Sequence, residues 1–278
     1  MRNLCAILLL FVLFSSSCLQ KPNSDRPKPE STQVLSVKEN MPKVGTPEYA
    51  LASITSDFEH YWNYHARYVK LYRDFLPVDE NDKPIEKEAF LLKLTKGKFL
   101  PLLIHTENPG GSYKLVKIPA HLKKDGGAVI ADYAKTQLRY FKMEGKPIPS
   151  FNFNDVNGVN YSSENTKGKI VLFKCWFIGC VACVQEMPEL NEMVEKYKNR
   201  KDILFISLAI DDKKPLLDFL GKTKFEYATV PNQEKYMTEK LKVNAYPSHF
   251  LIDKNGVLVK TVDTGSETSE VLEQLAVH

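Results

Sequence analysis

The hydrophobic pattern of the second half of the chain alternates between short apolar runs and helical periodicity. Residues 169–177 and 203–210 are almost wholly apolar, as is typical of buried strands. The segments "SHFLID" and "GVLVKTV" predict two further strands that are joined by a turn at residues 254–256. Helices are predicted at 180–198, 215–220, 233–241 and 266–276. Strands that alternate with helices and end in a hairpin predict an α/β fold, with a central mixed sheet and helices on both faces.

A hairpin is predicted ahead of these elements. The segments "SFNFNDV" and "VNYS" flank Asn157-Gly158, a pair of residues that favours a two-residue turn. We therefore place the start of the second domain at residue 143 and its end at residue 278.

Residues 46–142 predict a smaller α+β domain. Apolar and aromatic residues recur at helical spacing and predict one long helix from 46 to about 76. Its apolar face would carry Phe58, Tyr61, Trp62, His65, Val69, Tyr72 and Leu76. We interpret this face, with His60 and His65, as a packing surface rather than a ligand cage. A hairpin of 99–105 and 113–118 and a helix over 129–141 complete the domain, whose role the sequence does not indicate.

The N-terminus has the pattern of a secretory signal over residues 1–17. A positive start precedes an apolar run at 4–14, which is too short to span a bilayer, and small residues then lead to Cys18. This arrangement resembles a bacterial lipoprotein signal, which implies a lipid on Cys18; the alternative is plain cleavage with Cys18 incidental. Residues 18–45 contain four of the sixteen prolines and predict a flexible tether. We therefore expect an extracytoplasmic protein that is anchored to a membrane.

Composition and charge narrow the function classes. The 278 residues are 43% hydrophobic and 26% charged, and the formal net charge of +4 comes from interspersed charges of both signs. We expect no nucleic-acid partner, because the chain has neither a P-loop nor a basic cluster interleaved with aromatic residues.

Cys180 and Cys183 carry the candidate chemistry. Two cysteines three apart at the start of a helix lie within reach of a disulfide, and the helix N-terminus stabilises a thiolate. Cys180, at the more exposed end, would attack a substrate disulfide, and Cys183 would resolve the mixed disulfide. A structural disulfide and half of a zinc site are the alternatives. No second Cys-x-x-Cys or paired histidine follows, so we expect no metal.

Three segments resemble the thioredoxin superfamily, and specifically the extracytoplasmic TlpA/ResA-like thiol-disulfide oxidoreductases. They are "GKPIPSF", "GKIVLFKCWFIGCVACVQEMPELNEM" and "LKVNAYPSHFLIDKNGVLVKTVDTG". The resemblance implies a thioredoxin-like fold for 143–278 and a redox-active Cys180–Cys183 disulfide without another cofactor. It further implies disulfide-bearing client proteins, a membrane thiol reductant as electron donor, and a place in the bacterial cell envelope or periplasm. Such proteins often serve cytochrome c maturation.

The resemblance also assigns residues around the cysteines. Pro247 matches the cis-proline that faces an extended substrate, and Tyr246 and Trp176 are expected to line the same groove. Glu186 matches an acidic residue that moves a proton or modulates the thiol pKa; alternatively it only complements the helix dipole. Pro188 should kink the helix.

Lys174 departs from the family pattern, which has an acid or an asparagine there. A lysine in an apolar strand needs a partner, so we expect it to pair with Glu186 and to favour the thiolate of Cys183. The alternative is that Lys174 snorkels to solvent. The neighbouring Cys175 should point to the opposite face as a buried thiol.

A second class of function stays open. In a client-binding or chaperone module, the aromatic N-terminal helix and the groove at Pro247 would hold clients with little redox turnover. A metal chaperone would require a histidine beside the cysteines. His249 is the candidate, but strand alternation does not fix the side to which it points.

Overall fold

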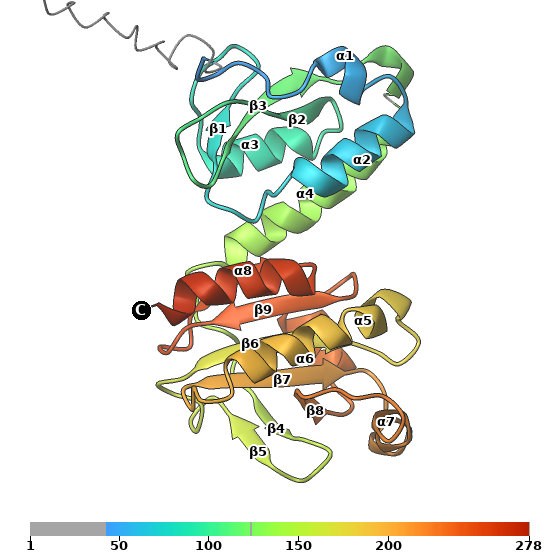
Figure 1. The fold of residues 1–278 in the computed structure, drawn as a ribbon, viewed down its shortest axis with the longest axis vertical. Helices are drawn as coiled ribbons and strands as arrows, with labels where there is room; N and C mark the ends of the chain where they lie inside the picture. The colour runs from blue at the N-terminus through green and yellow to red at the C-terminus, as the bar shows by residue number, and fades with distance from the viewer. Residues whose placement is uncertain (1–42, 123, 278) are drawn as a thin grey trace, which may run out of the picture. The chain divides into compact units, whose positions relative to one another are not determined.

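The computed structural model describes residues 43–122 and 124–277 (Figure 1). The predicted signal at 1–17, the lipidation of Cys18 and most of the tether lie outside the described residues. Within these two ranges, no helix combines the length and the apolar character that a membrane crossing requires.

A five-stranded mixed sheet forms the centre of the second half (Figure 1). The strand order is β10-β9-β6-β7-β8, in which β7 runs parallel to β6 and β8 while β9 runs antiparallel to β6 and β10. The strands are β6 (Ile170–Trp176), β7 (Ile203–Ala209), β8 (Ala228–Val230), β9 (Ser248–Ile252) and β10 (Leu258–Val262). Four of them confirm predicted strands, and the short β8 was not predicted. The arrangement is the thioredoxin-like α/β fold expected from the sequence.

Helices cover both faces of this sheet. On one face, α6 (Met187–Lys196) and α8 (Gly265–Ala276) pack against Leu172 and Leu251. On the other face, Phe173 and Phe250 pack with the π-helix η3 (Tyr236–Lys240). Residues 234 and 235 are α-helical and lead into η3, so the helix predicted at 233–241 is confirmed. The helix α7 (Lys213–Leu220) follows β7.

The helix predicted at 180–198 is interrupted at Glu186. It forms α5 (Val181–Gln185) and α6, with Pro188 in the first turn of α6. Proline has no N–H to donate and clashes with the preceding turn, so the expected kink occurs there. The interruption directs the Glu186 side chain into the region behind the two cysteines.

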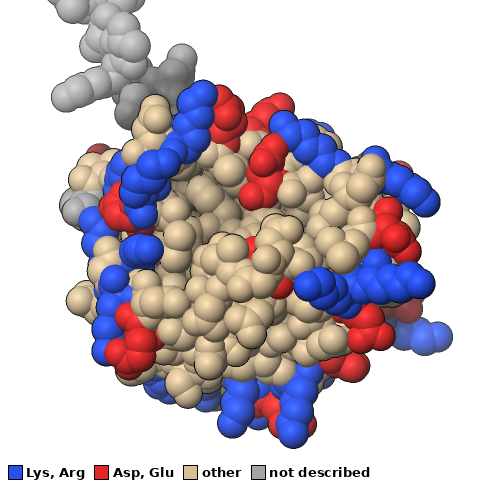
Figure 2. All heavy atoms as spheres, turned by 90° about the horizontal axis from the view of Figure 1, so that it is seen from below, with Lys and Arg blue, Asp and Glu red and all other residues tan. Residues whose placement is uncertain are grey.

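The predicted hairpin is present as β4 (Asn152–Asn154) and β5 (Asn160–Ser162), but its connection is longer than two residues. Asp155 accepts hydrogen bonds from the backbone N–H groups of Asn157 and Val159, which stabilises the wider turn. Figure 2 views the molecule from the end at which β4 and β5 lie in Figure 1. Uncharged residues occupy the middle of this face, and charges of both signs lie around them.

The first half is built on a three-stranded sheet in the order β1-β3-β2. The strands β2 (Phe99–Leu103) and β3 (Ser112–Lys117) confirm the predicted hairpin, and β1 (Leu76–Val78) pairs parallel to β3. Helices pack around one hydrophobic cluster of this half; they are α1 (Leu51–Ile54), α2 (Phe58–Tyr68), α3 (Lys87–Leu94), η2 (Ala120–Leu122) and α4 (Asp125–Met143). The elements α1 to α4, with their sheet, give the expected α+β composition.

The single helix predicted from 46 to 76 is wrong. Asp57 starts a new helix, because its side chain accepts a hydrogen bond from the backbone N–H of His60, and α2 ends at Tyr68. The predicted apolar face is also partly wrong, since Phe58, Trp62 and Leu76 are exposed. Tyr64, which was not assigned to that face, is buried.

The helix α4 leads from the first half to the second and ends at Met143, at the predicted domain boundary. Its beginning is fixed by a close approach to Gly97, at which a Cβ on Gly127 would lie only 2.7 Å from a backbone oxygen. Near its end, Tyr140 packs edge-on against Phe250 of β9, with ring centroids 6.4 Å apart, and bonds Ser248 at 3.1 Å.

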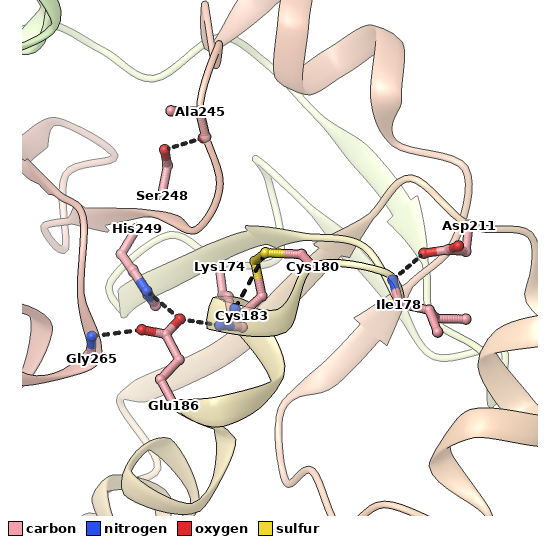
Figure 3. Close-up of a disulfide and its surroundings, with 10 residues drawn as sticks. All are labelled: Lys174, Ile178, Cys180, Cys183, Glu186, Asp211, Ala245, Ser248, His249 and Gly265. Carbon is pink, nitrogen blue, oxygen red and sulfur yellow. Dashed lines mark hydrogen bonds and ion pairs between the residues drawn. A yellow bond between two sulfur atoms is a disulfide. The ribbon is translucent and has the colours of Figure 1, made fainter.

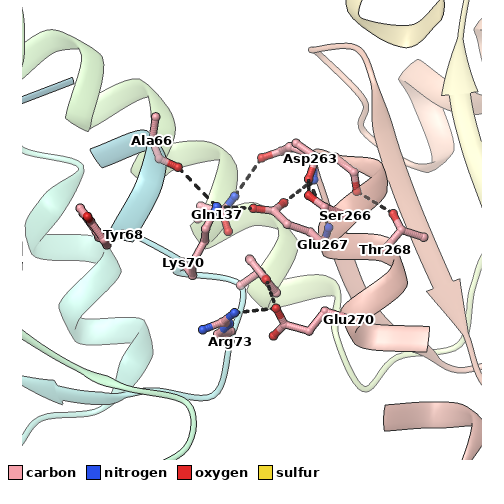
Figure 4. A network of polar contacts seen from close by, with 12 residues as sticks. Ala66, Tyr68, Lys70, Arg73, Gln137, Asp263, Ser266, Glu267, Thr268 and Glu270 are labelled. Carbon is pink, nitrogen blue, oxygen red and sulfur yellow. Dashed lines mark hydrogen bonds and ion pairs between the residues drawn. The ribbon is translucent and has the colours of Figure 1, made fainter. Parts of the chain in front are cut away.

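A polar network ties the loop after α2 to α8 (Figure 4). Lys70 lies 3.4 Å from Glu267, and Arg73 pairs with Glu270 at 2.5 Å. Tyr72 also donates to Glu270 at 2.9 Å. These contacts and α4 hold the two halves together at two separate places.

Candidate redox site

Cys180 and Cys183 form a disulfide at the end of the central strand, with Cα atoms 5.3 Å apart (Figure 3). All seven residues of β6 are buried, so the strand delivers the chain to the edge of the sheet before α5 begins. The short turn between them is held by Asp211, whose carboxylate accepts a hydrogen bond of 2.8 Å from the N–H of Ile178. Residues from β6 and from the end of β7 therefore position the two cysteines.

The two cysteines are not equivalent. Cys180 occupies the N-cap of α5, and its sulfur accepts a hydrogen bond of 3.2 Å from the backbone N–H of Cys183. Cys180 is 8% exposed, whereas Cys183 is fully buried. An incoming sulfur atom therefore meets Cys180 first, and that sulfur has the N–H group that stabilises a thiolate.

One wall beside the cysteines comes from the Tyr246–Pro247 segment. Its peptide bond is cis, as the family resemblance implies. The Tyr246 ring packs edge-on against Phe177, with centroids 5.5 Å apart, and contacts the buried cluster that contains Cys180.

Trp176 does not line this groove, contrary to the sequence-based expectation. It is the last residue of β6, and its ring is fully buried against Phe219 and Phe225 at centroid distances of 5.6 and 5.8 Å. The physical reason is that every side chain of this central strand is covered on both faces of the sheet.

Behind the disulfide, the Glu186 carboxylate is bound from three elements (Figure 3). One oxygen pairs with the ammonium of Lys174 on β6 and accepts a hydrogen bond of 2.9 Å from Nε2 of His249 on β9. The other accepts a 2.9 Å bond from the backbone N–H of Gly265 at the start of α8. Lys174 is fully buried, so the pairing with Glu186 is present and the snorkelling alternative is wrong.

Burial and charge oppose each other in this group. Burial lowers the pKa of Lys174, and the Glu186 carboxylate counteracts part of that effect. Burial would raise the pKa of Glu186, but the bond from His249 and the charge of Lys174 hold it below its ordinary value. Burial also lowers the pKa of His249, which keeps the imidazole neutral at neutral pH. The group therefore contains one buried cation and one buried anion.

Cys175 lies on the other face of β6. It is a free, fully buried thiol among Phe173, Ile206 and Phe250, and burial raises its pKa well above the ordinary range. This confirms the expected buried core thiol, which takes no part in the Cys180–Cys183 pair.

His249 is the residue that sequence reasoning could not place. It lies directly opposite Lys174 in the antiparallel pairing of β9 with β6, which brings both side chains to Glu186. The sequence signal was one polar residue in each of two otherwise apolar strands, Lys174 and His249. It predicts that the two side chains lie close together only when the register of the strands is known. Within the part of the chain that the structure describes, no three metal-ligating side chains gather at one place.

The comparisons with known proteins concern the same half of the chain. The Redoxin family model matches residues 143–275. Thiol-disulfide oxidoreductase ResA of Bacillus cereus is 31% identical over 144 residues, which cover 51% of this chain and 79% of the relative. ResA of Geobacillus kaustophilus is 30% identical over 131 residues, which cover 47% of this chain and 74% of that protein. A putative thiol-disulfide oxidoreductase structure from Bacteroides vulgatus is 27% identical, covering 48% of this chain and 96% of its own, with a TM-score of 0.43.

The Redoxin match begins before β4, ends within α8 and includes the two cysteines. The identity and coverage of the ResA proteins are sufficient to assign a family and its class of reaction. This chain is an enzyme that belongs to the TlpA/ResA-like thiol-disulfide oxidoreductases of the thioredoxin superfamily.

Proposed function

We propose that this protein reduces disulfide bonds of client proteins through a cycle of the Cys180–Cys183 pair. The observation that carries the proposal is the asymmetry of the pair: the partly exposed sulfur of Cys180 receives the N–H of Cys183, which is itself fully buried. The first sulfur suits attack on a client, and the second suits an intramolecular reaction only.

The cycle consists of two thiol–disulfide exchanges. The Cys180 thiolate attacks one client sulfur, forms a mixed disulfide and releases the other client sulfur as a thiolate. Cys183 then loses its proton and attacks Cys180, which forms the Cys180–Cys183 disulfide and releases the first client sulfur. Two electrons and two protons pass to the client. A dithiol reductant in the membrane returns the pair to its reduced state.

Within this proposal, Glu186 accepts the proton that Cys183 loses, and the Lys174 ammonium favours the Cys183 thiolate. The fully buried ammonium of Lys174 supports the role of Lys174, and the position of the Glu186 carboxylate behind the disulfide supports that of Glu186 (Figure 3). Lys174→Met removes the buried positive charge, so the pH midpoint for alkylation of Cys183 should rise. An unchanged midpoint would contradict the role of Lys174.

We further propose that the mature protein is held at the outer side of a bacterial membrane by a lipid on Cys18, facing the periplasm or its equivalent. The signal-like residues 1–17 and the proline-containing tether support this location. Clients would then be extracytoplasmic proteins whose cysteines must be kept reduced, as in cytochrome c maturation. Labelling with a radioactive fatty acid, compared with a Cys18→Ala variant, tests the anchor.

The first test is the reduction potential of the Cys180–Cys183 pair in the purified mature protein. Equilibration with thiol/disulfide buffers, followed by alkylation of free thiols, gives the value. A potential near or below about −230 mV supports a reductase, whereas one near about −120 mV indicates an oxidant.

A groove next to the cis-proline favours a second candidate, a client-binding module with little redox turnover. It has a volume of about 690 Å³ and includes Tyr246 and Pro247 in its lining. The double variant Cys180→Ser/Cys183→Ser separates the two functions. Retained biological function would support the binding module, and complete loss would support redox catalysis.

A further inference from the structure

The groove beside Pro247 has walls from both halves of the chain. The cis-proline segment and the end of β10 form one wall, and α4 of the N-terminal half forms the other. The lining residues are Asp132, Tyr133, Lys135, Thr136, Arg139, Asn244, Ala245, Tyr246, Pro247 and Asp263. Tyr246 also packs against the buried cluster that contains Cys180, so this residue belongs both to the groove and to the surroundings of the disulfide.

The α4 wall is fixed relative to the redox site by hydrogen bonds along the helix. Gln137 donates to Asp263 at 3.2 Å (Figure 4), and Tyr140 bonds Ser248 at 3.1 Å. Arg139 donates to the side chain of Asn244, three residues before the cis-proline. The N-terminal half therefore supplies a rigid part of the surface that a client meets at the redox site.

The charges that line the groove differ in how they are compensated. Asp132 and Lys135 pair with each other at 2.8 Å on the exposed side of α4. Burial, with the nearby Glu267, raises the pKa of Asp263 to about 7, although Tyr140 and the charge of Arg139 oppose the rise, so the Asp263 carboxylate is only partly ionised near neutral pH. Arg139 forms no ion pair with any residue in 43–122 or 124–277.

Arg139 also has unused donors. Its Nη2 bonds the side chains of Asn244 and Thr136, which are both neutral, and its buried Nε has no partner in the described part of the chain. A guanidinium group has five N–H donors and binds carboxylates in a bidentate manner. Among the described residues, Arg139 therefore has no carboxylate within ion-pair distance and keeps free donors, and it lies close to the cis-proline segment.

We propose that Arg139 selects clients in which an acidic side chain lies near the reactive cysteine, and that it binds this side chain while an extended client segment occupies the groove. The inference rests on the proposed reductase function, since the segment that fills the groove is the one whose disulfide Cys180 attacks. It also gives the N-terminal half a role: α4 contributes to substrate specificity.

The test uses three substrates and the full mature protein. Two short peptides, each with one internal disulfide, differ only in having glutamate or lysine beside one cysteine, and bis(2-hydroxyethyl) disulfide is the small neutral substrate. Arg139→Gln retains a donor for Asn244 without the charge, and Arg139→Glu inverts the charge. Lys135→Gln is the matched control, because it removes a cation of α4 that is already paired. Thermal unfolding confirms that each variant is folded.

We expect the wild-type protein to reduce the glutamate peptide with a kcat/KM about tenfold higher than the lysine peptide, mainly through KM. Arg139→Gln should abolish the preference, Arg139→Glu should reverse it, and Lys135→Gln should keep it. Reduction of the small disulfide should change by less than about twofold in every variant.

Three results would overturn the inference. Equal rates for both peptides with wild-type protein, or a preference that Lys135→Gln removes as fully as Arg139→Gln does, would show that Arg139 does not read charge. An equal loss on all three substrates in Arg139→Gln would show that it only holds the cis-proline segment. A wild-type protein that reduces none of the three substrates would instead contradict the proposed function itself.

Discussion

Each half of the molecule buries a histidine, and the two environments differ. His65 of α2 is 5% exposed and lies among aromatic rings, stacked on Trp62 and edge-on to Tyr133 at centroid distances of 5.7 and 4.7 Å. Its Nε2 has no hydrogen-bond partner in the described residues. His249 of β9 is 1% exposed, and its Nε2 bonds the carboxylate of Glu186, which also binds Lys174.

The difference separates packing from chemistry. Burial lowers the pKa of both imidazoles, to about 4 for His65, and only His249 has a carboxylate that opposes the shift. The aromatic environment of His65 requires only a ring that packs well. The group around His249 contains one buried cation and one buried anion, so the loss of either charge should destabilise the fold. Burial of a histidine is therefore not informative about function until its partners are known.

The largest effect should come from the charged group around His249. Glu186→Ala leaves the ammonium of Lys174 buried without its partner, which should lower the free energy of unfolding by about 3–5 kcal/mol. Urea denaturation at neutral pH measures the loss. The double variant Glu186→Ala/Lys174→Met removes both charges and should recover most of it; no recovery would show that the pair is not the source of the cost.

The aromatic environment of His65 should make the fold sensitive to acid. The folded-state pKa of about 4 lies below the ordinary value of 6.5, so the unfolded chain binds a proton first as the pH falls. The associated stability is complete above pH 6.5 and decreases by up to about 3 kcal/mol as the pH approaches 4. His65→Phe should reduce this dependence on pH, as measured by urea denaturation at several pH values, without affecting disulfide reduction. Parallel curves for the two proteins would contradict the pKa assignment.

A smaller loss of stability should follow from Tyr64→Phe in the N-terminal half. The buried hydroxyl donates to the carbonyl of Pro101 at 3.0 Å and accepts from the N–H of Leu103 at 2.8 Å. Removing it leaves two backbone groups of β2 unsatisfied, which should cost about 1–3 kcal/mol. Reduction of a small disulfide should stay unchanged. A large loss of that activity would show that the N-terminal half acts in the chemistry.

The smallest effect should come from His249→Gln, which retains a donor for Glu186 and removes the titrating ring. Because the lowered pKa keeps His249 neutral, the pH midpoint for alkylation of Cys183 should move by less than about one unit. Lys174→Met should move it further. Equal shifts in the two variants would mean that the imidazole carries charge in the folded protein.

The sequence was sufficient where the signal is local or periodic. The apolar runs predicted β6, β7, β9 and β10, the Cys-x-x-Cys spacing predicted a pair that can close a disulfide, and the polarity of Lys174 in an apolar strand predicted its ion pair with Glu186.

The sequence was insufficient for features that depend on tertiary contacts. The apolar and aromatic spacing between 46 and 76 continues across Asp57, so only the capping bond reveals that a new helix begins there. His249 reaches Glu186 through the register of β9 against β6, which two short apolar runs do not specify. Trp176 is a large aromatic residue close to the cysteines in the sequence, so it was expected to line the groove. Only its position at the end of a strand that is covered on both faces shows that it is buried.

Because α4 is one continuous helix, an insertion in it has a different geometric consequence from a substitution. Gly127, near its start, is fixed against Gly97, while Arg139, three turns later, faces the groove at Pro247. One residue inserted between them would rotate everything after it by about 100° and advance it by about 1.5 Å. Point changes on α4 can therefore alter which clients are bound, whereas insertions and deletions there would turn the helix out of phase and remove Arg139 from the groove.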